Sequence, residues 1–176
     1  SMDNVTGTTL SDDSGGGASA TLSGGVVQVV GDSGLALGFS SGGQGQFSSP
    51  SLAAVTNITV SALIYSDSLP TGTGIIAQEY VAEDIQFAFG FSGVNPQTTG
   101  SRLYFGTFDD ADGSFIWNYA VDDNDIPFGR WVHVAATYDG AAIKLFVDSV
   151  NVAEVSYSGG LNSSSGNYFV GRNWSG

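Results

Sequence analysis

The stretch Trp131-Val132-His133-Val134-Ala135-Ala136-Thr137-Tyr138-Asp139-Gly140 decides the fold. Residues 130–138 and 142–147 are both rich in the β-branched and aromatic residues that favour strands. Asp139-Gly140, which lies between them, is a favoured turn of a β-hairpin. The sequence therefore predicts an antiparallel hairpin at this point of the chain.

Strand patterns continue on both sides of this hairpin. Residues 58–65 alternate in period two, which predicts a sandwich strand with both faces at least partly covered. Further strands are predicted at 26–30, 35–39, 74–78, 86–91, 102–108, 114–121, 151–157 and 167–171. Some ten short strands without a convincing helix predict an all-β fold, a two-sheet antiparallel jelly-roll β-sandwich, as a single domain over residues 1–176.

Composition limits the partners of this domain. There are 17 acidic residues against 4 basic ones, giving a net charge of −13, so nucleic acids and anionic membranes are repelled. No apolar run is long enough to span a membrane, so we expect no membrane insertion. The absence of cysteine excludes a disulfide framework and thiolate metal sites. The carboxylates suit Ca²⁺, and they equally suit a merely solubilising surface.

Several stretches together resemble a known family. Besides 131–140, these are 13–17 with 20–25, then 34–39, 58–64, 145–148 and 168–173. In this order they are similar to laminin-G-like, concanavalin A-like lectin/glucanase domains. The resemblance implies a jelly roll whose loops recognise a glycan or glycoprotein. It also implies an extracellular, cell-surface or virion-surface location within a larger protein.

The chain departs from the family pattern at three places. Ser149 stands where the family usually has Gly in a hairpin turn, and Gly43-Gln44-Gly45 stands where many members carry an acidic residue near a structural Ca²⁺. We expect the strands that usually flank the domain, before Gly7 and after Gly176, to be absent or replaced. We therefore expect open sheet edges, and with them self-association through an edge strand.

Catalytic residues are not predicted, and the chain is not expected to be an enzyme. Glu79, Glu83 and Glu154 do not form the E-x-D-x-x-E pattern of glucanases on this scaffold, whose chemistry needs paired carboxylates on one face. His133, the single histidine, is part of the framework strand in the resembling family.

Two acidic segments are candidates for ligand or metal binding. Asp109, Asp110 and Asp112 lie together in a predicted loop that ends in Gly113, and they are the predicted Ca²⁺ ligands. The segment does not match the EF-hand pattern, and a solvated turn is the alternative. A second acidic loop begins at Asp122, at the other end of the predicted strand 114–121.

Aromatic residues complete the predicted ligand site. Trp117 and Tyr119 share one face of their strand and could stack on sugar rings, although a stripe of this kind can also be core. With Asp122, Asp123 and Trp174 they form the predicted ligand-binding set. The sequence predicts a non-catalytic glycan-binding or adhesion module. The alternatives are a protein-interaction module of a surface or viral fibre protein and, third, a glycan-degrading enzyme.

Overall fold

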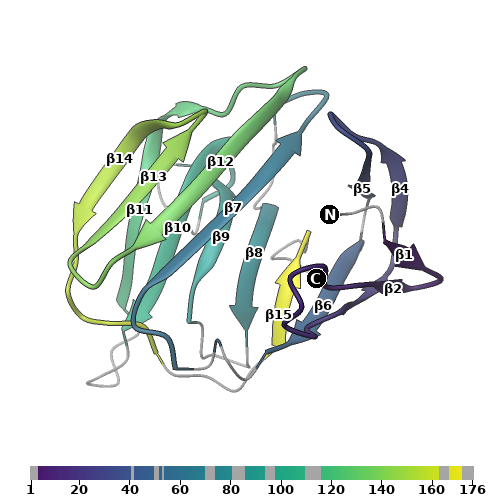
Figure 1. Ribbon diagram of the computed structural model, residues 1–176. Coiled ribbons are helices and arrows are strands. Elements are labelled where there is room, and N and C mark those ends of the chain that lie inside the picture. The colour runs from purple at the N-terminus through teal and green to yellow at the C-terminus, as the bar shows by residue number, and fades with distance from the viewer. Residues whose placement is uncertain are drawn as a thin grey trace.

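The structure is a computed structural model of the whole chain (Figure 1). It describes residues 4–40, 42–49, 52, 54–69, 74–80, 86–93, 98–109, 116–162 and 167–171. Within these ranges the chain forms β-strands and no α-helix, which confirms the predicted all-β class. Nowhere in them is there a helix with the length and apolarity needed to cross a membrane.

The predicted hairpin forms the centre of a four-stranded antiparallel sheet. In spatial order its strands are β14 (Val150–Ser156), β13 (Ala142–Val147), β12 (Trp131–Tyr138) and β7 (Ile58–Tyr65). The carboxylate of Asp139 accepts hydrogen bonds from the amides of Ala141 and Ala142, at 2.9 and 2.8 Å. These bonds close the turn between β12 and β13, as the Asp-Gly pair predicts.

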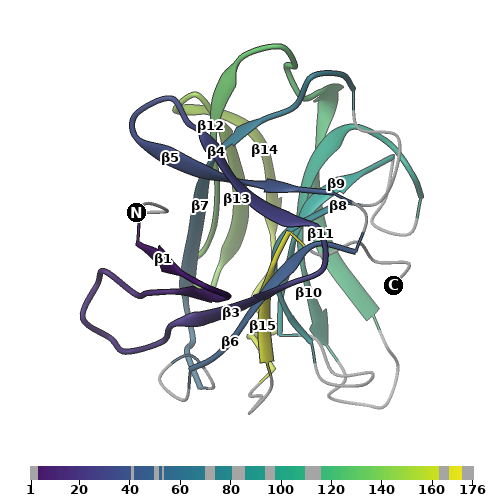
Figure 2. The same cartoon turned by 90° about the vertical axis from the view of Figure 1, so that its right-hand side faces the viewer.

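The second layer is a nine-stranded sheet that curves around one end of the molecule (Figure 2). In spatial order its strands are β1 (Val5–Thr6), β2 (Thr9–Leu10), β3 (Ala20–Ser23), β6 (Gln44–Ser48), β15 (Asn167–Val170), β8 (Gly74–Tyr80), β9 (Ala88–Ser92), β10 (Arg102–Asp109) and β11 (Ile116–Asp125). β15, the last strand of the chain, pairs with β6 on one side and with β8 on the other. Strands distant in sequence therefore meet at the middle of this sheet.

The main core lies between the two sheets. In β12 the side chains of Val132, Val134, Ala136 and Tyr138 are buried, whereas the alternate side chains point outward. They face buried residues of the other sheet, which include Phe89, Leu103, Phe105 and Tyr168. Full burial of a side chain such as Leu103 contributes roughly 1.5–3 kcal/mol, so this layer is the main source of stability.

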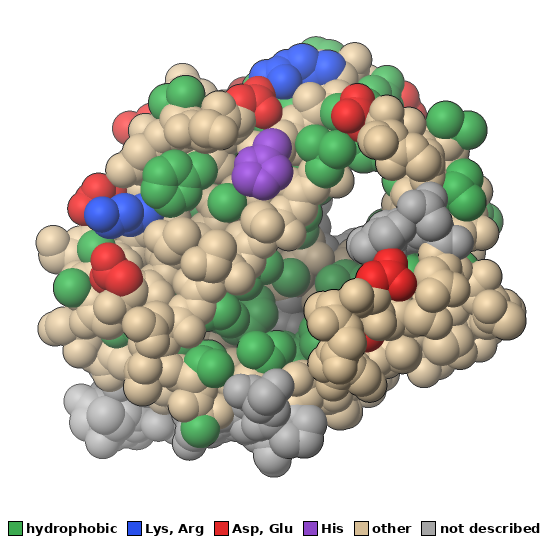
Figure 3. Space-filling view, in the orientation of Figure 1, with side chains coloured by type: hydrophobic (Ala, Val, Ile, Leu, Met, Phe, Trp, Pro, Cys, Tyr) green, Lys and Arg blue, Asp and Glu red, His purple; other side chains and the backbone are tan. Residues whose placement is uncertain are grey.

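A short hairpin stands apart from both sheets. Its strands are β4 (Val26–Val30) and β5 (Leu35–Phe39), and within the described chain they pair only with each other. Both were predicted as strands, and both form. In Figures 1 and 3 the hairpin is separated from the four-stranded sheet by an opening.

The second predicted acidic loop is instead part of a strand. β11 continues to Asp125, which pairs in register with Arg102 of β10. The register slips between Arg102 and Tyr104, so a β-bulge places extra residues of β11 opposite β10. The prediction of a loop from Asp122 onward was wrong in this respect, because pairing with β10, the preceding strand, extends β11 to Asp125.

Candidate functional site

The structure places the two aromatic residues that were predicted to bind a ligand on the outer face of the nine-stranded sheet. Trp117 and Tyr119 lie on β11 and are both partly buried. Trp117 packs against Gly106 of β10, where a methyl group would lie 3.0 Å from the indole ring. With Val121 it belongs to a small second cluster around Tyr104. The alternative that these residues pack as core therefore applies in part to Trp117.

Tyr104 lies at the centre of this second cluster. The side chain is fully buried, and among the described residues its hydroxyl has no hydrogen-bond partner. Burial raises the pKa of Tyr104 well above the usual range of a tyrosine, because the phenolate would lose its hydration.

The predicted acidic residues do not come together in one site within the described chain. Asp122 is buried, and its carboxylate accepts hydrogen bonds from the amide and the side chain of Asn124, at 2.9 and 3.3 Å. Its neighbour Asp123 is exposed. The backbone of Asp109 ends β10, whereas Asp110, Asp112 and Trp174 lie outside the described residues. In the described part of the chain, no group of three acidic or histidine side chains could hold a metal ion.

Of the carboxylates and the histidine that were considered for catalysis, the structure describes the side chains of Glu154 and His133. Glu154 of β14 forms an ion pair with Lys144 of β13 at 3.5 Å. Glu79 lies in β8 opposite Tyr168 of β15, and its side chain is outside the described part, as is the whole of Glu83. His133 is exposed on the outer face of the four-stranded sheet, where it is visible in purple in Figure 3.

A different aromatic surface contains two exposed rings beside a partly buried tryptophan. Tyr65 of β7 and Trp131 of β12 are opposite each other in register, with ring centroids 5.5 Å apart and planes tilted by 53°. Phe128, two residues before Arg130, is 52% exposed, and Tyr65 is 47% exposed. We call Tyr65, Phe128 and Trp131 the rim patch.

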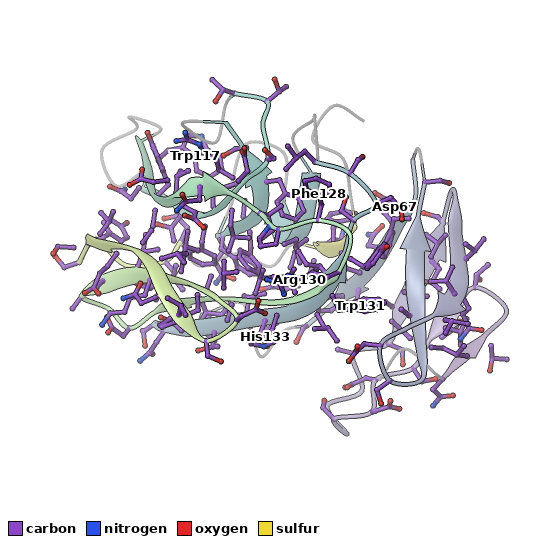
Figure 4. The ribbon with its side chains drawn as sticks, turned by 90° about the horizontal axis from the view of Figure 1, so that it is seen from above. Asp67, Trp117, Phe128, Arg130, Trp131 and His133 are labelled. Carbon is purple, nitrogen blue, oxygen red and sulfur yellow. The ribbon has the colours of Figure 1, made fainter. Side chains whose placement is uncertain are left out.

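The loops around the rim patch are joined to each other. The amide of Gly129 donates a hydrogen bond to the carbonyl of Ser66 at 2.8 Å, which brings the loop after β11 beside the loop after β7. Asp67 and Phe128 are adjacent in sequence to these two residues. Figure 4 shows Asp67 and Trp131 on the side of the sandwich nearer the β4–β5 hairpin, distant from Trp117.

Charged groups beside the rim patch are held by a short hydrogen-bond network. Arg130 forms an ion pair with Asp148 at 2.7 Å and donates a second hydrogen bond to the carbonyl of Trp131 at 3.1 Å. Asp148 also accepts a hydrogen bond from the amide of His133 at 3.0 Å. The hydrogen bond from Arg130, followed by that from His133, holds the pKa of Asp148 below its usual range. A cation, an anion and an imidazole thus lie next to the exposed rings.

Sequence reasoning missed the rim patch, although a signal for it was present. Trp131 and His133 alternate with the buried Val132 and Val134, so their side chains must leave the core on the opposite face. Tyr65 occupies the same outward phase of β7. Aromatic rings on such a surface can stack on the C–H faces of sugars, and flanking charged groups can hydrogen-bond hydroxyls.

Comparison with known proteins supports the fold. The family model described as concanavalin A-like lectin/glucanases superfamily matches residues 15–176. A comparison with curated protein sequences gave no match. Domain 4 of AbnA, an extracellular GH43 arabinanase from Geobacillus stearothermophilus, has a TM-score of 0.69 at 19% identity over 94% of this chain and 79% of that one. The binding domain of botulinum neurotoxin DC has a TM-score of 0.65 at 15% identity over 94% of this chain and 40% of that one.

Proposed function

The chain belongs to the concanavalin A-like lectin/glucanase superfamily, and from this premise we propose that it is a carbohydrate-binding module that holds its glycan on the rim patch. The observation that carries the proposal is the pair of Tyr65, which is exposed, and Trp131, which is partly buried, set on adjacent strands at a ring separation of 5.5 Å. Both strands belong to the paired framework of the sheet, so the rings are positioned before the ligand arrives.

The structural relatives support this kind of ligand. The structure of the arabinanase domain was solved in complex with arabinotriose, and that of the neurotoxin binding domain in complex with SialylT. These are properties of those proteins, and their likeness to this chain is one of fold. They support the choice of carbohydrates as the first ligands to test.

The chemistry of the rim patch explains how a sugar would be held. The rings of Trp131 and Tyr65 offer area for the apolar face of a pyranose or furanose, at a low cost in side-chain entropy. Arg130 and Asp67 border this area and supply a donor and an acceptor for hydroxyl groups. We propose binding without catalysis, on a protein that works outside the cell or at its surface.

Trp117 and Tyr119 provide the competing position for the same function. Trp117 packs against Gly106 and beside the buried Tyr104, and both Trp117 and Tyr119 are partly buried, whereas the rim patch contains the exposed rings of Tyr65 and Phe128. The sequence groups Asp122, Asp123 and Trp174 with these two rings, and it suggests a separate Ca²⁺ site at Asp109, Asp110 and Asp112; both remain predictions.

A glycan array followed by titration calorimetry tests the proposal. Tyr65→Ala should weaken binding of the best glycan at least tenfold, and Trp131→Ala should do the same. Trp117→Ala is the matched control, and it should leave the affinity unchanged. Loss of binding in the Trp117 variant alone would move the site to the nine-stranded sheet.

Two further arms of the same experiment test the remaining parts of the proposal. Repeating the titration in a chelator tests the calcium expectation, because a lower affinity without Ca²⁺ would support a metal-dependent site. Prolonged incubation with each bound glycan tests the absence of catalysis. Cleavage of any bound glycan would contradict that absence, and a failure of every glycan to bind would refute the proposed function itself.

A further inference from the structure

Few basic side chains are available to an acidic ligand. The chain has 17 acidic residues against 4 basic ones, which are Arg102, Arg130, Lys144 and Arg172. Arg102 belongs to β10 of the nine-stranded sheet, and Arg172 lies outside the described residues. Lys144 of β13 forms an ion pair with Glu154 at 3.5 Å. Arg130 is therefore the basic residue on which an acidic glycan at the rim patch would depend.

The charge of Arg130 is already compensated. One of its guanidinium nitrogens lies 2.7 Å from a carboxylate oxygen of Asp148, and another donates a hydrogen bond to the carbonyl of Trp131 at 3.1 Å. Both partners of the ion pair remain reachable, because the side chain of Arg130 is 51% exposed and that of Asp148 is 41% exposed. A guanidinium has five N–H donors, so some remain for the hydroxyl groups of a ligand. The positive charge, however, is matched by the carboxylate.

The turn between β13 and β14 holds Asp148 in this position. Asp148 and Ser149 have φ values of 47° and 70°, the left-handed conformation that favoured two-residue hairpin turns require. The amide of Asp148 donates a hydrogen bond to the carbonyl of His133 at 2.8 Å, and its carboxylate accepts one from the amide of His133 at 3.0 Å. The carboxylate is thus fixed to β12 by its own backbone contacts, and it stays beside Arg130 when a ligand arrives.

Asp67 adds a negative charge at the border of the rim patch. It follows Ser66, whose carbonyl accepts a hydrogen bond from the loop after β11. Arg130 contributes one positive charge, whereas Asp148 and Asp67 contribute one negative charge each. With the histidine counted as neutral, the formal charge around the patch is therefore negative. A carboxylate or sulfate group on a sugar would meet like charge here, which disfavours binding.

The geometry of the aromatic pair adds a second restriction. The ring planes of Tyr65 and Trp131 are tilted by 53° at a centroid separation of 5.5 Å. Rings at this angle cannot both lie flat against one plane, so the face of a crystalline polysaccharide would contact only one of them. A single chain can turn between successive units and present an apolar C–H face to each ring.

A second outward pair continues the surface along the same two strands. His133 of β12 is in register with Leu63 of β7, two residues along from the aromatic pair. Leu63 is 49% exposed, and His133 is exposed as well. Leu63 supplies apolar area, and the imidazole of His133 can donate or accept a hydrogen bond from a hydroxyl group. Neither contact requires a charge on the ligand.

From these observations we infer that the rim patch takes a single soluble chain of neutral sugars. It rejects glycans built of uronate, sialic acid or sulfated sugars, and it rejects the flat face of a crystalline polysaccharide. The inference rests on the proposed function, because it names the class of glycan for the same site. Hydroxyl groups of the chain use the remaining donors of Arg130 and the carboxylate oxygens of Asp148 and Asp67.

An array of soluble oligosaccharides in neutral and acidic pairs tests the charge restriction. Cellotetraose is paired with the β-1,4-linked tetraglucuronate, mannotetraose with tetramannuronate, and lactose with sialyllactose, and arabinotriose is a further neutral probe. In titration calorimetry, the acidic member of each pair should bind at least about tenfold more weakly than the neutral member. Added NaCl should leave the affinity of the neutral member unchanged and should narrow the difference, because salt screens the repulsion.

Two outcomes of this array have different meanings. An acidic glycan that binds as tightly as its neutral counterpart, with or without added Ca²⁺, and that loses binding in Tyr65→Ala, would leave glycan binding in place and overturn the neutral class. A failure of every probe to bind would refute the proposed function, and this inference with it.

A substitution tests whether the ion pair sets the preference. Asp148→Asn keeps the size of the side chain, suits a positive φ and leaves Arg130 without its anionic partner. The preference for the neutral member should fall at least about threefold, as expected for one exposed charge pair. Asp139→Asn removes the same charge at the other end of β12 and should leave the preference unchanged. Circular dichroism confirms that both variants are folded. An equal effect of the two would show that net charge sets the preference and would overturn the role of the rim patch.

Sedimentation with microcrystalline cellulose and crystalline chitin tests the restriction to a single chain. The protein should stay in the supernatant with both solids, whatever its affinity for cellotetraose. Retention on either solid that Tyr65→Ala abolishes would show that the tilted rings do accept a flat face, and it would overturn this part of the inference.

Discussion

Replacing Tyr104 with Phe should stabilise the protein, although the same change at a buried tyrosine usually has the opposite effect. The side chain of Tyr104 is fully buried beside Ala88 on the outer face of the nine-stranded sheet. Its hydroxyl has no hydrogen-bond partner among the described residues. Phe keeps the ring in place and removes only this hydroxyl.

The expected magnitude follows from the cost of burying an unpaired hydroxyl. Leaving a buried polar group unsatisfied costs about 1–3 kcal/mol, and removing it should return most of this free energy of unfolding. For a chain of 176 residues, each kcal/mol changes the melting temperature by about 2–4 °C. Tyr104→Phe should therefore raise the melting temperature by several degrees.

A matched control is provided by Tyr138, which is equally buried but hydrogen-bonded. Its hydroxyl accepts a hydrogen bond from the amide of Gly160 at 3.0 Å. Tyr138→Phe should lower the free energy of unfolding by about 1 kcal/mol, because it leaves that amide unpaired. Urea denaturation and calorimetry of both variants give the comparison. Equal destabilisation by the two substitutions would refute the reasoning, since it would show that the hydroxyl of Tyr104 is bonded.

Three further predictions concern the turns and the acidic residues. Ser149 has a positive φ of 70°, a conformation that costs a non-glycine residue about 1–3 kcal/mol of strain. Gly removes this strain, but its flexible backbone loses more entropy on folding, so Ser149→Gly should raise the free energy of unfolding by only about 0.5–1 kcal/mol. A loss of stability in urea denaturation would contradict this prediction. The side-chain and backbone hydrogen bonds from Ser14 lower the pKa of Asp12 to about 2. The contribution of the Asp12 carboxylate to stability is therefore complete above about pH 4, and it is lost as the pH falls from there towards the lowered pKa. The difference in melting temperature between wild type and Asp12→Asn should therefore shrink between pH 4 and pH 2, and a constant difference would exclude Asp12 as the titrating group. Gly171 has a φ of 74° and lies against the ring of Phe39. Gly171→Ala should therefore lower the free energy of unfolding by about 2 kcal/mol or more, measured by calorimetry, and adding Phe39→Ala should restore only the part of this loss that is due to the steric clash. A neutral Gly171→Ala would show that the base of the β4–β5 hairpin is not held at this contact.

Local sequence patterns predicted which residues form strands better than they predicted which strands pair with each other. The hairpin around Asp139-Gly140 was predicted because its turn and both strands are encoded within a few residues, and the structure confirms it. Strands 26–30 and 35–39 were also predicted, but no local pattern shows which sheet a strand joins. The position of β4 and β5 outside both sheets depends on contacts with distant residues such as Gly171.

The candidate site shows the same division between local and long-range information. Trp131 could be placed on an outward face from alternation alone, but its exposure depends on what covers β7 and β12. Asp122 was predicted in a loop because it lies in an acidic, turn-like run. The structure places it in β11, where pairing with β10 and a hydrogen bond from Asn124 bury its carboxylate. Asn124 is only two residues away, but composition does not show that β10 pairs beyond Val121.

The central position of β15 determines when the nine-stranded sheet can be completed during synthesis. Ser48 of β6 donates a hydrogen bond to Asn167 of β15 at 2.8 Å, across 119 positions of the chain. Until Asn167–Val170 has left the ribosome, β6 and β8 have no common neighbour. The nascent chain then holds two incomplete half-sheets with unpaired strand edges. Pairings of such high contact order form slowly, so folding must largely follow translation. A ribosome stalled before residue 167 would present a chain that aggregates.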